Sequence, residues 1–323
     1  MSSSNRITWI TSFEFFFMLF FSPLSGYLFD NYGPRLPIVV GGLMHVFGLM
    51  MTSLSKEYYQ FFLSQSVCSG LGTSLIFTPA MTSPMTYFKE RRALVGGITV
   101  AGSSLAIATI SSNLPHGGRK FEIANYTRPF TEPKFLILLG FCYFLYWGVF
   151  VPFNYLVISS VEYGMSLSMA FNLIPIMNGA SFIGRTVPNV LADKYGRFNV
   201  LIVMVFFTGV ITLALWLPGH SKAALIVYAA IFGITSGTCI GLTPPLVMTI
   251  FPPSEVGFRI GTALAIANIA ALTSPPIAGA IASKSGGSYE NSTVFSGVNL
   301  LIATASLIWL RVQVAGWKPT TKA

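Results

Sequence analysis

The sequence GYLFDNYGPR, residues 26–35, is a short charged turn between two apolar runs that are each long enough to cross a bilayer. A weaker copy, LADKYGR at residues 191–197, lies between two further apolar runs. The offset between Asp30 and Asp193 equals the offset between Gly33 and Gly196. One turn repeated at matching places in two apolar halves indicates an internally duplicated membrane protein.

The residue types in this turn have a direct physical reading. Glycine provides the backbone freedom that a tight reversal needs. An Asp near a helix end and an Arg just beyond it are charges kept at the membrane surface, where they can pair with each other or with a neighbouring helix terminus. The alternative for a single copy is a solvated hairpin whose charges only reach the interface.

The composition excludes an ordinary water-soluble domain. Of the 323 residues, 53% are hydrophobic and 9% are charged, whereas soluble domains carry about 25% charged residues. We therefore predict an integral membrane protein that contacts the lipid bilayer. The net charge of +9 is explained by cytoplasmic loops rich in Lys and Arg, and it does not point to a nucleic-acid partner.

Ten apolar segments reach the length of about 20 residues that one helical crossing needs. They are longer than the strands of a membrane barrel and do not alternate in polarity, so we expect an all-α chain. The segments are residues 7–29, 36–55, 58–88, 93–113, 135–159, 169–191, 198–217, 223–248, 258–283 and 294–312. In the eighth of these, Gly233, Gly237 and Gly241 predict a face that packs closely against another helix.

The polar stretch 114–134 is the one clear linker. It predicts a partial N-terminal helical bundle over residues 1–113 and a C-terminal bundle over residues 135–323. If all ten spans alternate with the first turn in the cytoplasm, most loop Lys and Arg residues fall outside, against the positive-inside rule. If one crossing is absent between Ala93 and Lys134, the second half turns over. Most of these residues and both Asp turns then lie in the cytoplasm, as does the linker.

Several motifs carry a resemblance to a known family. The pattern G-x-L-x-D-x-x-G-x-R at residues 26–35 resembles the loop between the second and third helices of the major facilitator superfamily. Residues 87–104, YFKERRALVGGITVAGSS, resemble the signature of its monocarboxylate-transporter branch. The stretches PFNYL at 152–156, ASFIGR at 180–185 and PPIAG at 275–279 resemble the seventh, eighth and eleventh helices of the fungal members.

This resemblance implies two pseudo-repeated helical bundles and a register within a twelve-helix architecture. Residues 7–10 resemble the start of the family's second helix, and the linker directly follows a segment similar to its fifth. We therefore expect an incomplete major facilitator fold of about ten spans that lacks the first and sixth helices. The resemblance also implies a conformational-gate motif, which comprises Gly26, Asp30, Gly33, Arg35, Asp193, Gly196 and Arg197.

The implied function is secondary-active transport of a small organic anion, monocarboxylate-like, or of a related metabolite, by alternating access. A co-transported proton is a candidate second substrate, and the family's usual location is the plasma membrane. Export of a secondary metabolite and a non-transporting remnant or scaffold protein are the alternatives. The chain shows no P-loop, G-x-S-x-G motif or catalytic constellation, so we expect neither an enzyme nor a bound cofactor or metal.

Arg185 is the first candidate for substrate contact. An Arg inside an apolar helix is a functional hypothesis by default, and its planar donors suit both oxygens of a carboxylate. The resemblance implies the same role for an Arg of the eighth helix. The alternative is a side chain that reaches the helix end near Leu191, about 10 Å away. Asn154 and Asn178 are further substrate-binding candidates, with helix packing as their alternative role.

Glu14 is the other charge inside a predicted span and is a candidate proton carrier. Its alternative is a position near the outer interface, within reach of water. His45 is alone in its predicted span. Ser181 stands where some family members carry an Asp, so that family's proton-linked pair does not transfer to this chain. Asn291 begins the sequon Asn291-Ser292-Thr293 and is expected to face outward and carry a glycan.

Overall fold

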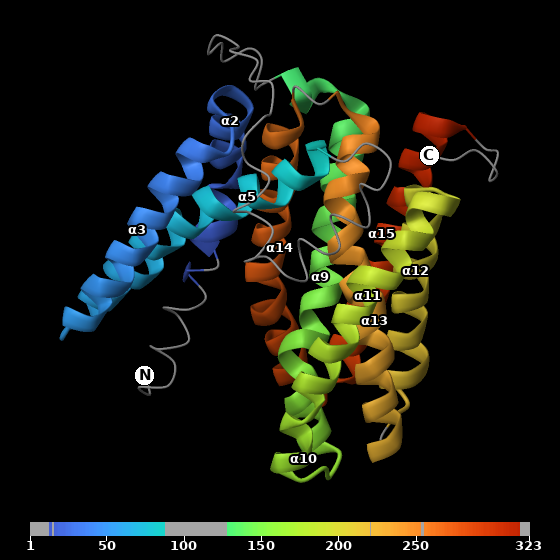
Figure 1. The fold of residues 1–323 in the computed structure, drawn as a ribbon. Helices are drawn as coiled ribbons and strands as arrows, with labels where there is room; N and C mark the ends of the chain where they lie inside the picture. Colours follow the sequence, from blue (N-terminus) through green and yellow to red (C-terminus); the bar gives the residue numbers. More distant parts are fainter. Residues whose placement is uncertain (1–12, 15, 88–127, 220, 253–254, 317–323) are drawn as a thin grey trace.

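The computed structural model describes residues 13–14, 16–87, 128–219, 221–252 and 255–316 (Figure 1). Within these ranges the regular structure is helical, and eight helices are long and apolar enough to cross a membrane. This confirms the predicted all-α membrane fold. The predicted span at residues 93–113 and most of the linker lie outside the described ranges.

The helical elements follow the predicted spans closely. In the N-terminal half, a helical stretch from Phe16 to Phe20 precedes α2. The elements that follow are α2 (Ser22–Tyr32), α3 (Arg35–Leu54), α4 (Tyr58–Phe61), the π-helix η1 (Phe62–Ser69) and α5 (Gly70–Tyr87). The C-terminal half comprises η2 (Arg128–Thr131), α9 (Pro133–Glu162), α10 (Leu167–Phe171), α11 (Leu173–Tyr195), α12 (Arg197–Ile211), η3 (Thr212–Trp216), α13 (Lys222–Ile250), α14 (Val256–Lys284) and α15 (Glu290–Ala315).

In both predicted turns a glycine ends the preceding helix. Gly33 ends α2 with φ of 74°, and Gly196 ends α11 with φ of 97°. These are left-handed values that glycine adopts without the steric cost of a Cβ atom. The glycine of each copy is therefore explained by helix termination, as the sequence predicts.

The helices gather in two groups that meet at α14 (Figure 1). In the C-terminal half, α11 packs along α13, while α9 packs on α14 and α15. In the N-terminal half, α3 packs on η1 and α5. The helix α14 also packs along α2, and among the described elements this is the main contact between the two halves.

Both charged turns lie at the same end of the molecule. Arg197, just after the second turn, donates a hydrogen bond to Thr249 Oγ1 near the end of α13. Asp30, in the first turn, accepts hydrogen bonds at the beginning of α14, which follows α13. This same-side placement is the one that the distribution of Lys and Arg predicts. Asn291, at the beginning of α15, follows the far end of α14 and therefore lies at the opposite end.

The predicted glycine face of α13 is a helix-packing surface. Side chains at Gly233 and Gly237 would run into the backbone of α11 at Met177 and Ser181. The contact is reciprocal, because a side chain at Gly184 on α11 would meet the carbonyl oxygen of Ile234. Small residues here let the two backbones approach closely.

We expect Gly184→Ala to lower the free energy of unfolding by about 1–3 kcal/mol, because its new methyl group clashes with a backbone carbonyl that cannot rotate away. Gly179→Ala, five residues earlier on α11, is the matched control: nothing lies within 4 Å of the position that its Cβ would take. There the higher helix propensity of Ala predicts a neutral effect or a gain of up to about 1 kcal/mol. Unfolding in detergent measures both, and equal effects would contradict the packing explanation.

Candidate functional site

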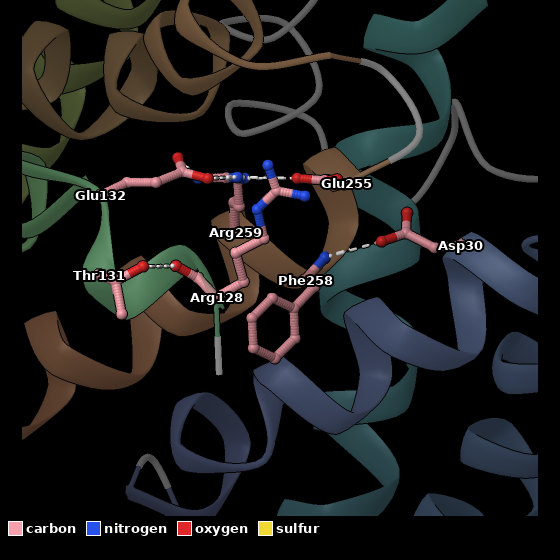
Figure 2. Close-up of polar contacts among 7 residues, drawn as sticks. All are labelled: Asp30, Arg128, Thr131, Glu132, Glu255, Phe258 and Arg259. Atoms are coloured by element: carbon pink, nitrogen blue, oxygen red, sulfur yellow. Dashed lines mark hydrogen bonds and ion pairs between the residues drawn. The ribbon is translucent and has the colours of Figure 1, made fainter. Parts of the chain in front are cut away.

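The first turn joins the two halves through the carboxylate of Asp30. Its Oδ1 accepts a hydrogen bond from the backbone N–H of Gly257 at 3.1 Å. Its Oδ2 accepts one from the backbone N–H of Phe258 at 2.9 Å, which Figure 2 shows. These amides belong to the first turn of α14, where N–H groups lack an intrahelical acceptor. The positive end of the helix dipole also favours an anion at this point. Asp30 thus caps a helix of the opposite half.

Glycines make this contact between the halves possible. A side chain at Gly26 would meet the carbonyl group of Gly257, and one at Gly257 would meet Asp30. One turn further along α14, a side chain at Gly261 would meet the carbonyl oxygen of Ser22. The backbones of α2 and α14 therefore touch along two turns. The glycines of the first motif serve both the turn and the approach of the two halves.

A buried arginine lies beside this junction. Arg259 Nη1 and Nη2 donate to the two carboxylate oxygens of Glu132 at 2.8 and 2.9 Å, and Nη2 and Nε donate to Glu255 at 2.7 and 3.2 Å (Figure 2). The Arg259 side chain is 3% exposed. Its guanidinium carbon lies 4.0 Å from the ring centroid of Phe251 and 5.2 Å from that of Phe135. The cluster fixes the beginning of α9 to the beginning of α14.

This cluster is not predicted by the sequence, in which Glu132 belongs to the linker and Arg259 is the second residue of the span at 258–283. The available signals were an Arg one residue inside a predicted span and an acidic residue just before another. The spacing of 127 residues between them gave no reason to join them.

The second turn is built differently from the first. Asp193 pairs with Arg197 at 3.3 Å, within the same turn, and Arg197 Nη1 also donates to Thr249 at 2.7 Å. These contacts lie inside the C-terminal half. Arg35, the arginine of the first copy, is exposed at the beginning of α3. Both copies end a helix with a left-handed glycine, but the contact between the halves described above is made by the first copy.

Arg185 is half-buried on α11. Its Cγ atom would lie 3.7 Å from a Cβ atom at Gly241, so its stem packs against α13. The side chain therefore lies within the C-terminal bundle, at the contact of α11 and α13, and its role in substrate contact stays a prediction.

The two asparagine candidates are both exposed. Asn178 is two helical turns before Arg185 on α11, so the two residues share a face of that helix. Asn154 lies on α9, and its amide donates to the carbonyl oxygen of Phe150 at 2.7 Å. A contact between Asn154 and Arg185 is not among those seen in the described ranges. The substrate-binding role of both asparagines stays a prediction.

Glu14 lies in a polar cluster rather than alone. Its carboxylate accepts hydrogen bonds from Gln65 Nε2 at 3.2 Å and from Ser69 Oγ at 3.1 Å. Ser69 Oγ in turn lies 2.8 Å from Nδ1 of His45. His45, which is alone in its predicted span, is thus joined to Glu14 through one hydroxyl group. Asn291 is exposed and donates to Ser285, and its glycan stays a prediction.

Known proteins resemble this chain over most of its length. The chain is 52% identical to the "MFS-type transporter opdF" of Penicillium oxalicum over 355 aligned positions, which cover 99% of this chain and 84% of that protein. It is 35% identical to the "Fujikurins efflux protein" of Gibberella fujikuroi, covering 96% of this chain and 74% of that protein. It is 34% identical to the "Aspyridones efflux protein apdF" of Emericella nidulans, covering 88% and 65%.

Two solved structures share the fold. The fucose:proton symporter FucP of E. coli matches with a TM-score of 0.74 and 15% identity, covering 95% of this chain and 91% of that chain. The human organic anion transporter MFSD10 matches with a TM-score of 0.73 and 15% identity, covering 92% and 82%. Residues 1–112 and 136–323 match the Major Facilitator Superfamily as a family. The chain therefore belongs to the major facilitator superfamily and is a multi-pass membrane transporter, not an enzyme.

Proposed function

We propose that this protein exports a small secondary metabolite by alternating access. The observation that carries this proposal is its similarity to transporters whose names describe efflux, those for fujikurins and aspyridones. Among the alternatives raised by the sequence, export is favoured over the main hypothesis of monocarboxylate-like transport. We propose the plasma membrane as its location, because an exporter there would release the metabolite directly into the medium.

The junction of α2 and α14 supports alternating access. The two Asp30 hydrogen bonds hold the halves together at the end where both turns lie. In alternating access, one bundle rocks against the other around a central site. Opening this end would separate Asp30 from Gly257 and Phe258, which returns both groups to water. The junction is therefore suited to close and open this end reversibly.

The chemistry of Arg185 supports an anionic cargo. A half-buried arginine at the contact of α11 and α13 attracts a carboxylate or a similar oxyanion and can bind it through two parallel hydrogen bonds. We therefore propose that the exported metabolite carries such a group, with Asn178 on the same face of α11 as a further contact. An exporter whose cargo carries a carboxylate would agree both with the monocarboxylate-transporter-like motifs of the sequence and with the export function.

The experiment compares secreted and retained metabolites, by untargeted mass spectrometry, between the parent organism and a strain that lacks this gene. We expect at least one acidic metabolite to remain in the cells of the deletion strain. Reintroduction of the wild-type gene should restore secretion, whereas Arg185→Ala should reduce it by about 10²-fold, the loss of one desolvated ionic contact of about 3 kcal/mol.

Thr186→Ala is the matched control for Arg185→Ala. The Thr186 hydroxyl donates to carbonyl oxygens of its own helix, at Phe182 and Ile183, so its loss should leave secretion unchanged. Unchanged metabolite distribution in the deletion strain would contradict export and would favour the remnant or scaffold alternative. Full secretion with Arg185→Ala would contradict the proposed contact between Arg185 and an anionic cargo, but it would not contradict export.

A further inference from the structure

A chain of polar side chains crosses the interior of the N-terminal half. Glu14 Oε1 lies 3.1 Å from Ser69 Oγ, and Ser69 Oγ lies 2.8 Å from His45 Nδ1. Thr73 Oγ1 lies 3.2 Å from the same nitrogen. These groups come from three separate segments, namely Phe13 and Glu14 before α2, the middle of α3 and the η1–α5 helix. Two ionisable groups of the N-terminal half are thus joined by one hydroxyl.

The helix that carries the bridging serine is locally rewound. Ser69 ends η1, a π-helix of eight residues that also carries Gln65. Runs of π-helix are rare and are found frequently at functional sites, because the wider turn changes the direction of side chains. Here it directs Gln65 and Ser69 to the two oxygens of one carboxylate. Ser69 is fully buried, so this direction is set by packing and not by solvent.

The direction of the chain follows once Glu14 is taken as an ionised carboxylate, which can only accept. The Thr73 hydroxyl donates its hydrogen to the carbonyl oxygen of Ser69 at 2.8 Å, and the Ser69 hydroxyl then donates its own hydrogen to Glu14. In this state both hydroxyl oxygens accept from His45, which places a hydrogen on Nδ1. The chain is then a donor series from the imidazole through Ser69 to the carboxylate.

We propose that Glu14, Ser69 and His45 form a proton-binding relay inside the N-terminal half. A proton binds to Nε2 of His45. The Nδ1–H bond then breaks as an O–H bond forms on Ser69, and the original Ser69 O–H bond breaks as an O–H bond forms on Glu14. One proton has moved to Glu14, and His45 is again neutral with its hydrogen on Nε2. The reverse series returns the proton, so no other reactant is consumed.

Glu14 and His45 are the ionisable groups that meet in this cluster, as far as the described residues show. Cys68, on the same π-helix, is directed at the carbonyl oxygen of Met44 on α3. The remaining charges of the packed N-terminal elements lie at helix ends: Asp30 and Arg35 at one, Lys56 and Glu57 at the other. Those of α14, Arg259 and Lys284, lie near the two ends of that helix. The relay is therefore separated from these charges by apolar turns of helix.

The relay also lies next to the contact between the two halves. Asn268 on α14 donates to the carbonyl oxygen of Phe16 at 2.8 Å, two residues after Glu14. A change of charge on Glu14 therefore acts on the helical segment that α14 contacts. We infer that the relay couples proton movement to the rocking of the halves; this coupling rests on the proposed transport function, whereas the proton site itself does not.

The proton site is tested on the full chain in liposomes, by infrared difference spectra between alkaline and acidic buffer. The wild type should show the C=O stretching band of a protonated carboxylic acid, and Glu14→Gln should lose it. Glu162→Gln, which removes an exposed carboxylate at the end of α9, should retain it. In Ser69→Ala the band should shift in frequency, because Glu14 loses the hydroxyl partner. An unchanged band in Glu14→Gln, or an unshifted band in Ser69→Ala, would overturn the relay.

Coupling is tested with the metabolite that the secretion comparison identifies. Liposomes containing Glu14→Gln should lose the metabolite accumulation that a pH gradient drives in the wild type, whereas liposomes containing the control Glu162→Gln should retain it. Accumulation by Glu14→Gln equal to that of the wild type would overturn coupling through this site. Absence of exchange in the wild type would instead contradict the proposed transport function, and the infrared result would still decide whether the proton site exists.

Discussion

Asp30→Asn is expected to speed hydrogen–deuterium exchange at the Gly257 and Phe258 amides by about tenfold or more. Both amides belong to the first turn of α14, where the helix itself offers no acceptor, and both donate to Asp30. Asparagine keeps one oxygen acceptor but loses the second oxygen and the negative charge. Hydrogen bonds to charged groups contribute about 1.5–3 kcal/mol, and each 1.4 kcal/mol is a factor of about ten in an equilibrium.

The same loss should shift the protein away from the state in which this end is closed. We expect secretion to fall by about tenfold with Asp30→Asn, because the closed state becomes too rare to complete the cycle. Asp193→Asn is the matched control: it changes the other copy of the turn, where the carboxylate pairs with Arg197 inside one half. Faster exchange at α14 in both variants, or in neither, would contradict the assignment of Asp30 as the contact between the halves.

The features predicted correctly from the sequence are those set by local physical chemistry. Apolar length fixes where helices cross a membrane, so the spans at 36–55 and 198–217 agree with α3 and with α12 plus η3 to within one residue at each end. Gly33 and Gly196 end their helices because a left-handed backbone is needed there, and this need is visible in the sequence as a glycine.

The partner of Asp30 could not be predicted in the same way. It is a pair of backbone N–H groups, and every residue except proline has one, so no residue type marks the contact. The distribution of Lys and Arg predicts only that the turns of Asp30 and Asp193 lie at the same end of the molecule. Only the packing of α2 along α14, through Gly26, Gly257 and Gly261, brings its carboxylate to the helix terminus.

Polar clusters inside the bundle were missed for a related reason. His45 and Glu14 appear isolated because each is the one ionisable group in its own apolar run. The π-helix that joins them through Ser69 has no signal in hydropathy, since it changes the direction of side chains without changing their polarity. Arg259 and Glu132 are similarly distant in sequence, and each looks like an ordinary charge at a span boundary.

In the Arg259 cluster, removing the arginine and removing the two glutamates should lower the free energy of unfolding by different amounts. Arg259→Met leaves Glu132 and Glu255, whose side chains are 35% and 30% exposed and can regain water. The methionine also keeps part of the contact with Phe251. We expect a loss of about 2 kcal/mol in the free energy of unfolding, of the size of the lost cation–π and partly exposed ionic contacts.

Glu132→Ala combined with Glu255→Ala should be more harmful than Arg259→Met. The double variant leaves a guanidinium that is 3% exposed without either carboxylate, and an uncompensated buried charge costs about 3–5 kcal/mol. Unfolding in detergent, followed by tryptophan fluorescence, compares the two, with the exposed Arg128→Ala as a control expected within about 0.5 kcal/mol of the wild type. A larger loss in Arg259→Met than in the double variant would show that packing of the arginine, and not burial of its charge, determines the stability of this end of the protein.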